Sequence, residues 1–308
     1  MALLKDYYDQ YHRGRLMREE QMDLGPLKLR SHGASNAAMS YDERYTPYIL
    51  RTGLLPFIHM VTRSTLWLNA PAITALVDRW RPEMHTFHLR TGEMTVTLQD
   101  VSMILALPIG GEPVCINTSS SGWREQMAAL IGRALEDRAN DRVPAGATYT
   151  WIVENFAQCP EGVDDEVVQQ YARVYVWYVI TRTLFADGGG RTAQWHWLKA
   201  LTVWDANWSW GTAALAYLYR QLDDACRRSK TDSGIGGPLL LLSVWSWDRF
   251  LVGRPILLTY NDWDDHGDPL RRSTWAYKWD VIKDNWSDTA LLYKQYTNEL
   301  DTLTLEQV

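Results

Sequence analysis

The sequence predicts a mainly α-helical chain: a single helical domain with one small β-hairpin at about residues 85–98. Apolar residues recur at helical spacing through most of the 308 residues, whereas an alternation typical of strands runs from Thr86 to Leu98. No internal repeat and no clear linker interrupts the chain. We therefore expect an N-terminal arm at residues 1–39 and one domain at residues 40–308.

The helices are predicted from their ends as well as from their spacing. Ser40 and Gly53 bound a helix at 41–52, and Asn69 begins another that ends at Arg81-Pro82. Further helices are expected at 98–106, 123–138, 149–158, 164–185, 192–203, 209–228 and 238–251, with two more helical patterns in 260–308.

The hairpin is predicted from polar and apolar residues that alternate on both sides of the Arg90 to Glu93 turn. If Leu89 faces Met94, the apolar side chains fall on one face, with His88 and Thr95 on the other. In that register Phe87 faces Val96, and the residues expected to be buried are Phe87, Leu89, Val96 and Leu98. Thr97 and Asp100 then have the spacing of a capping box that begins the next helix.

Composition limits the classes of protein. Apolar residues make up 46% and charged residues 22%, which is typical of a globular, soluble chain. The net charge of −6 argues against a broad electrostatic surface for nucleic acid. Three widely spaced cysteines fit a reducing, intracellular compartment, and no apolar run is long enough to span a membrane.

A basic run near the N-terminus is the best candidate for a local anion-binding or partner-binding surface. It comprises His12, Arg13, Arg15 and Arg18. The alternative is a solvated helix face or a loose tail.

Sixteen tryptophans predict a tryptophan-rich core, because each buries a large apolar area. Some of them are candidates for interface anchors instead, since tryptophan is enriched at binding hot spots. Trp263 among aspartates and Trp286 between Asn285 and Ser287 have the polar surroundings expected of such anchors.

Metal and phosphate sites receive little support from spacing. His85 and His88 are three apart, so on a strand they point to opposite faces and cannot share an ion. The acidic loop at 262–268 fails the calcium-loop pattern, because Ser273 stands where that pattern requires glutamate. The glycine-rich segments 188–190 and 234–237 match no phosphate-loop pattern and read as connectors. We expect no metal and no catalytic residues.

Five segments in order resemble the motifs of the plant mobile domain family. They are ALVDRWRPEMHTFHLRTGEMTVTLQDVSMILALPIGGEPV at 75–114, ENFAQCPE at 154–161, RVYVWYVITRTLFADGGG at 173–190, WSWGTAALAYLYRQLDDACRRS at 208–229 and GGPLLLLSVWSWDRFLVGRP at 236–255. The family signature falls on Trp80, Phe87, His88, Gly92, Glu93, Thr95, Thr97, Leu98 and Asp100, which we expect to be structural.

The sequence departs from the family pattern at two places. Ala106 stands where the family usually has glycine, and the chain ends where the family usually continues into a W-x-PY segment. We therefore expect the domain to lack its last C-terminal segment.

The resemblance implies a non-catalytic nuclear domain. Related proteins act in transposon silencing, gene expression and meristem maintenance, and they associate with phosphatases of the plant protein-phosphatase-seven type. A pyridoxal phosphate cofactor needs a Schiff-base lysine, and none of the seven lysines lies in the matched motifs beside a suitable loop. No cofactor is expected.

Two other classes of function stay open at this point. The first is a nucleic-acid-binding module that contacts DNA or chromatin and is shared with transposable elements. The second is an unrecognised enzyme. An arginine-rich face would favour the first alternative, and a deep pocket with convergent polar groups would favour the second.

Overall fold

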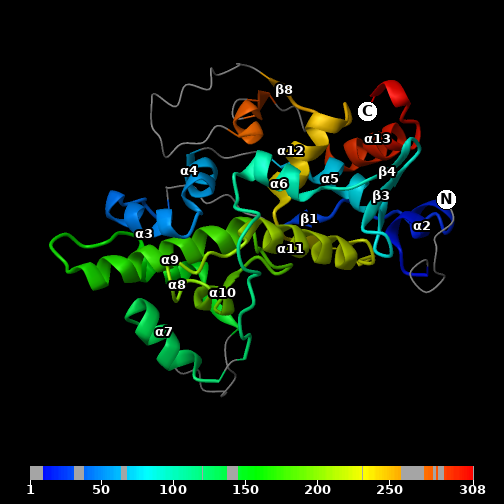
Figure 1. Ribbon diagram of the computed structural model, residues 1–308. Helices are drawn as coiled ribbons and strands as arrows, with labels where there is room; N and C mark the ends of the chain where they lie inside the picture. Colours follow the sequence, from blue (N-terminus) through cyan, green and yellow to red (C-terminus); the bar gives the residue numbers. More distant parts are fainter. Residues whose placement is uncertain are drawn as a thin grey trace.

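The computed structural model describes residues 10–30, 38–63, 68–119, 121–136, 145–230, 232–257, 274–279, 282–283 and 288–307. The helices are α2 Arg13–Arg18, α3 Thr46–Arg51, α4 Leu55–Arg63, α5 Ala70–Val77, α6 Leu98–Leu105, α7 Trp123–Ile131, α8 Tyr149–Phe156, α9 Asp165–Thr183, α10 His196–Lys199, α11 Trp210–Ala225, α12 Leu239–Arg249 and α13 Thr289–Asp301 (Figure 1). Three 3-10 helices are η1 Glu43–Tyr45, η2 Trp275–Trp279 and η3 Leu305–Gln307.

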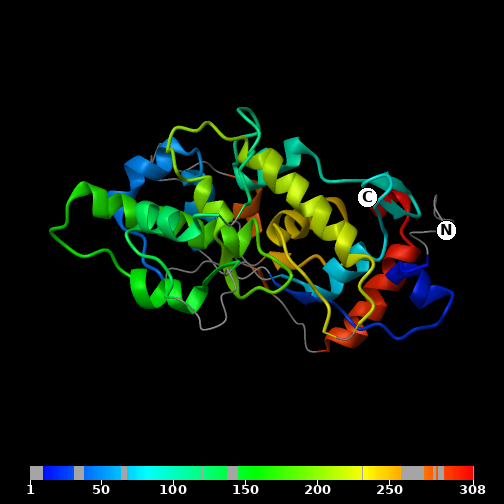
Figure 2. The same ribbon diagram turned by 90° about the horizontal axis from the view of Figure 1, so that it is seen from below.

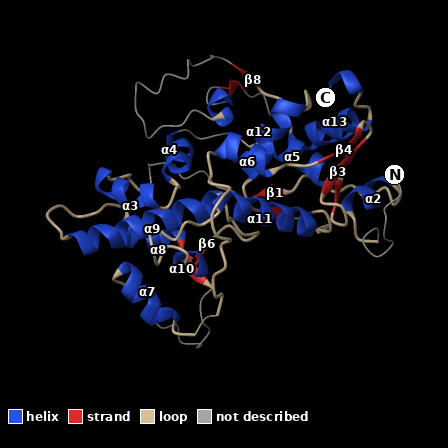
Figure 3. Cartoon of the chain, viewed as in Figure 1, coloured by secondary structure: helices blue, strands red, loops and turns tan. Residues whose placement is uncertain are grey.

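Short strands are distributed along the described residues. They are β1 Lys28–Leu29, β2 Trp80–Arg81, β3 Thr86–Leu89, β4 Gly92–Met94, β5 Gly146–Thr148, β6 Thr192–Gln194, β7 Gly234–Ile235, β8 Ile256–Leu257 and β9 Ile282–Lys283. They form one three-stranded sheet, β2-β3-β4, and the two-stranded sheets β1-β7, β5-β6 and β8-β9 (Figure 3).

The predicted fold class, mainly α with a single hairpin, is therefore wrong: the structure is helix-rich but mixed α/β. The additional strands have only two or three residues, too few to produce a visible alternation. Except for β2, which pairs with the neighbouring β3, their partners also lie far away in sequence, as in the parallel pairing of Lys28 with Gly234. Two predicted helices are partly wrong: 192–203 begins as strand β6, and the helix expected to end at Arg81-Pro82 ends at Val77 and is followed by strand β2.

Two long helices, α9 and α11, run across the middle of the molecule (Figure 1). Helices α5, α6, α12 and α13 lie on one side of them, and α7 and α10 lie on the other (Figure 1). In a second view α11 lies over α12, with α13 beside α5 (Figure 2). Within the described residues, no helix is both long enough and apolar enough to cross a bilayer.

The core is rich in tryptophan, as the composition predicted. The buried tryptophans are Trp80, Trp123, Trp177, Trp195, Trp197, Trp204, Trp210, Trp245, Trp247 and Trp279. Several pack on one another or on neighbouring rings, such as Trp247 on Trp279, whose ring centroids are 5.2 Å apart. Most of the excess aromatic surface is thus used inside the fold.

The hairpin forms as predicted, but in another register. Phe87 pairs with Met94 and Leu89 with Gly92, so a two-residue turn joins β3 to β4. The longer turn expected from Leu89 facing Met94 is wrong, because Gly92, with φ 136°, adopts a conformation that favours glycine and closes the turn earlier. Strand β2 adds a third partner, with Trp80 opposite Phe87.

The predicted faces of the hairpin are confirmed for most residues. Phe87, Leu89 and Val96 are buried, whereas His88 is on the other side of the strand. Leu98 is an exception, since it is 37% exposed at the first position of α6.

Truncation of Phe87 tests this packing. Its ring contacts Trp80 and Trp245 at centroid distances of 4.9 and 5.5 Å, so Phe87→Ala should lower the free energy of unfolding by about 3–5 kcal/mol. Leu98→Ala, at the exposed end of the same segment, is the control and should cost about 1 kcal/mol or less. Urea denaturation measures both; equal losses would contradict the packing described here.

Candidate functional site

The signature residues join the hairpin to the helices around it. Trp80 is buried and its Nε1 donates to Asp223 Oδ1 at 2.7 Å, which ties β2 to the end of α11. Thr97 accepts from Asp100 N, and the Asp100 carboxylate accepts from Thr97 N at 2.8 Å. The predicted capping box is therefore confirmed. Asp100 Oδ1 also accepts from Arg249 on α12 at 2.7 Å.

Ala106, the departure from the family pattern, ends helix α6 in a left-handed conformation with φ 53° and ψ 27°. Glycine adopts this conformation without the steric cost that a Cβ brings, roughly 1–2 kcal/mol. This steric cost explains why the family usually has glycine at this position.

Polar residues of the hairpin contact one another and also reach helix α11. Thr86 donates to Glu93 Oε2 at 3.0 Å, and Thr95 Oγ1 is 3.0 Å from the hydroxyl of Tyr219. His88 Nε2 is 3.3 Å from Glu93 Oε1, without the angle of a hydrogen bond. Burial lowers the pKa of His88, although Glu93 opposes this, so the ring is neutral near pH 7.

His85 and His88 do not converge. His85 adopts a left-handed backbone conformation with φ 52°, and its ring stacks on Tyr219 at 5.3 Å. Its Nε2 is 3.5 Å from Asp223, whereas His88 contacts Glu93. Among the described residues, no group of three histidine, cysteine or carboxylate side chains is placed to hold a metal ion.

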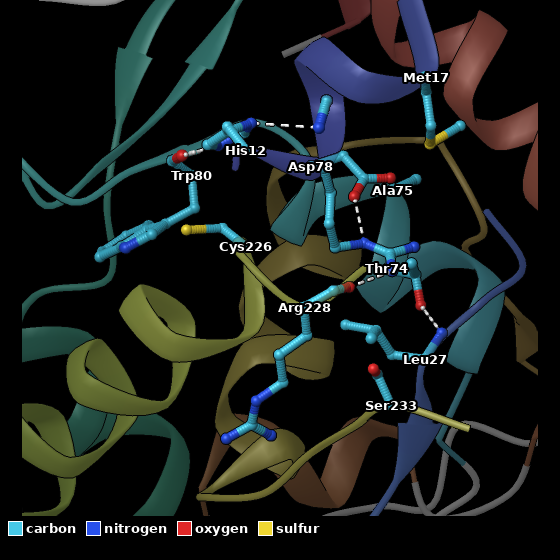
Figure 4. Close-up of polar contacts among 12 residues, drawn as sticks. His12, Met17, Leu27, Thr74, Ala75, Asp78, Trp80, Cys226, Arg228 and Ser233 are labelled. Atoms are coloured by element: carbon cyan, nitrogen blue, oxygen red, sulfur yellow. Dashed lines mark hydrogen bonds and ion pairs between the residues drawn. The ribbon is translucent and has the colours of Figure 1, made fainter. Parts of the chain in front are cut away.

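In the described part of the chain, Arg13 forms a buried polar junction with Asp78 and Arg228, and Figure 4 shows the latter two residues. Arg13 is 2% exposed, and its Nε donates to Asp78 Oδ1 at 2.9 Å. Its Nη1 donates to the carbonyl of Arg228 at 2.7 Å, and its Nη2 donates to the carbonyl of Gly25 at 2.9 Å. A single side chain thus connects α2 with the ends of α5 and α11 and with the segment before β1.

Tyr293 completes the junction from α13. Its hydroxyl donates to Asp78 Oδ2 and lies 3.3 Å from Arg13 Nη2. Burial, reinforced by the charge of Asp78, raises the pKa of Tyr293 far above its usual range, so it stays a neutral donor. Burial alone would lower the pKa of Arg13, but Asp78 and Tyr293 outweigh it, and the net pKa is raised.

Gly14 allows α2 to approach this closely. A Cβ at position 14 would lie 2.2 Å from the carbonyl oxygen of Asp78, a distance that no side chain tolerates. His12, the residue before Arg13, caps the N-terminus of α2. Its Nδ1 accepts from Gly14 N at 3.1 Å, and its Nε2 is 2.8 Å from the carbonyl oxygen of Trp80.

His12 is completely buried, and Arg81 Nη1 lies 2.8 Å from its Nε2. Burial, and then the positive charge of Arg81, lower the pKa of His12 to about 4. The imidazole is therefore neutral at physiological pH and acts as a structural hydrogen-bonding group.

A second ion-pair group lies at the edge of the junction. Arg79, also buried, donates to Asp301 Oδ1 at 2.7 Å and to the carbonyl of Thr297 at 2.6 Å. Arg18 donates to the same Asp301 oxygen at 2.9 Å. Helices α2, α5 and α13 are thus held together by charges as well as by apolar contacts.

The predicted N-terminal surface is therefore wrong for Arg13, which is buried. Arg15 pairs with Glu19 at 2.8 Å, and Arg18 pairs with Asp301 of α13, so each of these two arginines already has an acidic partner. The reading of a loose tail is also wrong for this stretch, because Leu16, Leu24 and Leu27 are buried. Sequence reasoning missed Asp78 and Tyr293 as partners, since neither proximity nor periodicity connects them to residue 13.

The two candidate tryptophan anchors, Trp263 and Trp286, lie outside the described residues. Among the described tryptophans, Trp275 is the exposed one, at 41%. It begins η2, which packs against α6 and α12. Leu251 after α12 and Ile256 in β8 are also exposed.

Comparison with known proteins gives a consistent result. The profile of a family described as plant mobile domain matches residues 56–308. In Arabidopsis thaliana, Serine/threonine-protein phosphatase 7 long form homolog is 40% identical over 191 residues, which cover 61% of this chain and 14% of that protein. Protein MAINTENANCE OF MERISTEMS is 36% identical over 192 residues, which cover 61% and 39%.

A third relative, Protein MAIN-LIKE 1 of the same plant, is 37% identical over 191 residues, which cover 61% of this chain and 37% of that protein. The chain therefore spans well under two thirds of the length of each of these relatives. No solved structure matched the chain.

Substitution of Arg13 tests the junction. Arg13→Ala leaves Asp78 buried without its cation, which should lower the free energy of unfolding by about 3–5 kcal/mol. Arg15→Ala, two positions later on α2, removes an exposed ion pair and should cost about 1 kcal/mol or less. Urea denaturation of both variants is the measurement. A loss below 1 kcal/mol for Arg13→Ala would show that the junction does not hold the helices together.

Acidification tests His12. Its pKa of about 4 in the folded chain is below the ordinary 6.5, so the unfolded chain binds the proton first. Its contribution to stability is complete above pH 6.5 and is lost as pH falls towards 4, a change of about 3 kcal/mol.

The variant for this measurement is His12→Asn, compared with the wild type. It should flatten the dependence of unfolding free energy on pH between 7 and 4.5. Parallel curves for wild type and His12→Asn would refute the assignment.

Proposed function

Because the chain belongs to the plant mobile domain family, we propose that it is a non-catalytic protein-interaction domain. Its partner in this proposal is a phosphatase-like protein of the phosphatase 7 type. The pair acts in the nucleus, in transposon silencing and in the control of gene expression.

The proposal that the domain is non-catalytic is supported by the buried junction, whose polar groups already have hydrogen-bond partners within the chain. Asp78 accepts from both Arg13 and Tyr293, and His12 is neutral and engaged through both ring nitrogens. A general acid or base needs a free position next to substrate and a pKa near the working pH. The pKa of His12 is far below that range and that of Tyr293 far above it, which supports a structural role.

The phosphatase part is supported by one relative. A protein named as a phosphatase 7 long form homolog contains a stretch 40% identical to this chain, and that stretch covers 14% of its length. A module that exists beside a phosphatase in one chain is a natural candidate for binding a phosphatase in another. This extension to a separate partner belongs to our proposal.

For the contact itself we propose the apolar surface around η2, defined here as Leu251, Ile256 and Trp275. All three side chains are exposed, and tryptophan is the residue type most enriched at interface hot spots. The packing of η2 against α6 and α12 gives Trp275 a firm base. An exposed apolar surface on a folded support is typical of protein-binding sites.

Co-expression with the phosphatase-like protein, followed by size-exclusion chromatography at micromolar concentration, tests the proposal. We expect co-elution of the wild-type chain and at least about tenfold weaker binding for Trp275→Ala, as for a hot-spot residue. Leu305→Ala, which removes an exposed leucine from η3, is the control and should bind normally. Separate elution of the wild-type chain and the phosphatase-like protein would refute the partnership. Equal binding of the phosphatase-like protein by both variants would refute the proposed contact surface but not the partnership.

A further inference from the structure

The two glycine-rich segments set aside as connectors are brought together in the structure. Gly237 N donates to the carbonyl of Ala186 at 2.8 Å, and a Cβ at Gly236 would lie 2.1 Å from the same oxygen. Segments 186–190 and 234–237, almost fifty residues apart in sequence, are therefore in direct backbone contact.

Each segment also accommodates an arginine. A Cβ at Gly188 would lie 3.0 Å from Arg228 Nη1, and one at Gly234 would lie 2.8 Å from Arg30 Nε. Arg228 donates to the carbonyl of Gly234 and so joins the two segments. At Gly234 a Cβ would also lie 2.8 Å from the backbone carbonyl oxygen of Lys28, so glycine is required there, whereas at Gly188 only the flexible end of Arg228 would have to move.

The amides of Gly189 and Gly190 are not available to an anion. Asp187 Oδ1 accepts from Gly189 N at 3.0 Å and from Gly190 N at 2.6 Å. The carboxylate of the chain thus occupies the place that a phosphate takes in a phosphate loop. Any anion at this face has to be held by basic side chains.

Basic residues are concentrated around these segments. Residues 28–30, 182–191 and 220–234 carry eight arginines and lysines against four aspartates, although the whole chain has a net charge of −6. Two of the aspartates are paired within these segments, Asp224 with Arg227 at 3.4 Å and Asp232 with Lys28 at 2.6 Å. The three segments therefore carry a net positive charge.

Four basic side chains in these segments form no ion pair with any described acidic residue. We name them the basic face: Arg30, Arg191, Arg220 and Lys230. Arg191, Arg220 and Lys230 are exposed, and Arg30 Nε is buried without a hydrogen-bond partner among the described residues.

The members of the basic face lie on segments that contact one another. Arg220 is one helical turn after Tyr217, whose hydroxyl donates to Ala186 O at 3.3 Å. Arg191 follows the glycine segment directly, and Arg30 N donates to Ile235 O at 2.8 Å. Lys230 is in the turn that leads to β7, where its carbonyl accepts from Ser233 N.

We propose that the basic face binds the phosphate backbone of a nucleic acid without reading its bases. Arginine suits this role because its planar fork matches phosphate oxygens. Nearby aromatic rings do not offer a stacking platform, since Arg182 lies over Tyr149 and Tyr178 at 4.9 and 5.1 Å. Contacts to the backbone alone give weak, sequence-independent and strongly salt-dependent binding.

This inference is independent of the phosphatase-binding proposal, because the basic face and the surface around η2 share no residue. The probes are fluorescein-labelled 20-nucleotide single-stranded DNA, duplex DNA and single-stranded RNA, titrated by fluorescence anisotropy at 50 and 200 mM KCl. Wild-type protein should bind at micromolar concentration at the lower salt and much more weakly at the higher.

A charge-matched pair of triple variants makes the test specific. Arg191→Gln/Arg220→Gln/Lys230→Gln should weaken binding at 50 mM KCl at least about tenfold and reduce the salt dependence by roughly two units of log–log slope. Arg90→Gln/Arg254→Gln/Lys294→Gln removes the same charge from exposed positions elsewhere, and should change affinity less than about twofold. Thermal melting checks that both variants are folded.

Two results would overturn the proposal. One is equal weakening by both triple variants, which would mean that only net charge matters. The other is the absence of any anisotropy change when wild-type protein is titrated to about 50 μM at 50 mM KCl.

Discussion

A buried guanidinium must have its charge neutralised and its N–H groups accepted, and the side of the fold that contains α2, α5 and α13 is organised around this requirement. Arg13 is 2% exposed and meets it with the Asp78 carboxylate and two backbone carbonyls. A buried ion pair of this kind adds little net stability over apolar packing, but removal of one partner is costly. It therefore fixes which segments must meet.

The junction and the signature hairpin form one structural unit. His12 contacts the carbonyl oxygen of Trp80, Trp80 packs on Phe87, and Phe87 packs on Trp245 of α12. The residues that make the family recognisable are in this way used for architecture. Function on such a scaffold is expected at surfaces, where side chains are not required to hold the fold.

The sequence was informative where structure is local. The capping box at Thr97, the apolar face of the hairpin and the extent of α9, Asp165–Thr183 against a predicted 164–185, depend on neighbours within a few residues. It was uninformative where the partner is distant. Nothing near Arg13 indicates Asp78, 65 residues away, and the two-residue strands β1 and β7 have no periodicity to detect.

The candidate sites divide in the same way. Charge counts found the N-terminal arginines, but only three-dimensional contacts separate buried Arg13 from exposed groups. Pattern alone led us to interpret the glycine segments 188–190 and 234–237 as connectors. Their meeting around Arg228 and Arg30 depends on tertiary contacts that no pattern contains.

The central claim is that residues 12–18 form one cooperative unit with α5 and α13. Native-state hydrogen exchange of the folded chain tests it most directly, because amides that open together exchange with one free energy. The account predicts that the amides of Leu16, Val77 and Leu300 exchange with the same free energy of opening, close to that of global unfolding. Rapid, unprotected exchange of Leu16 while Val77 and Leu300 remain protected would contradict it.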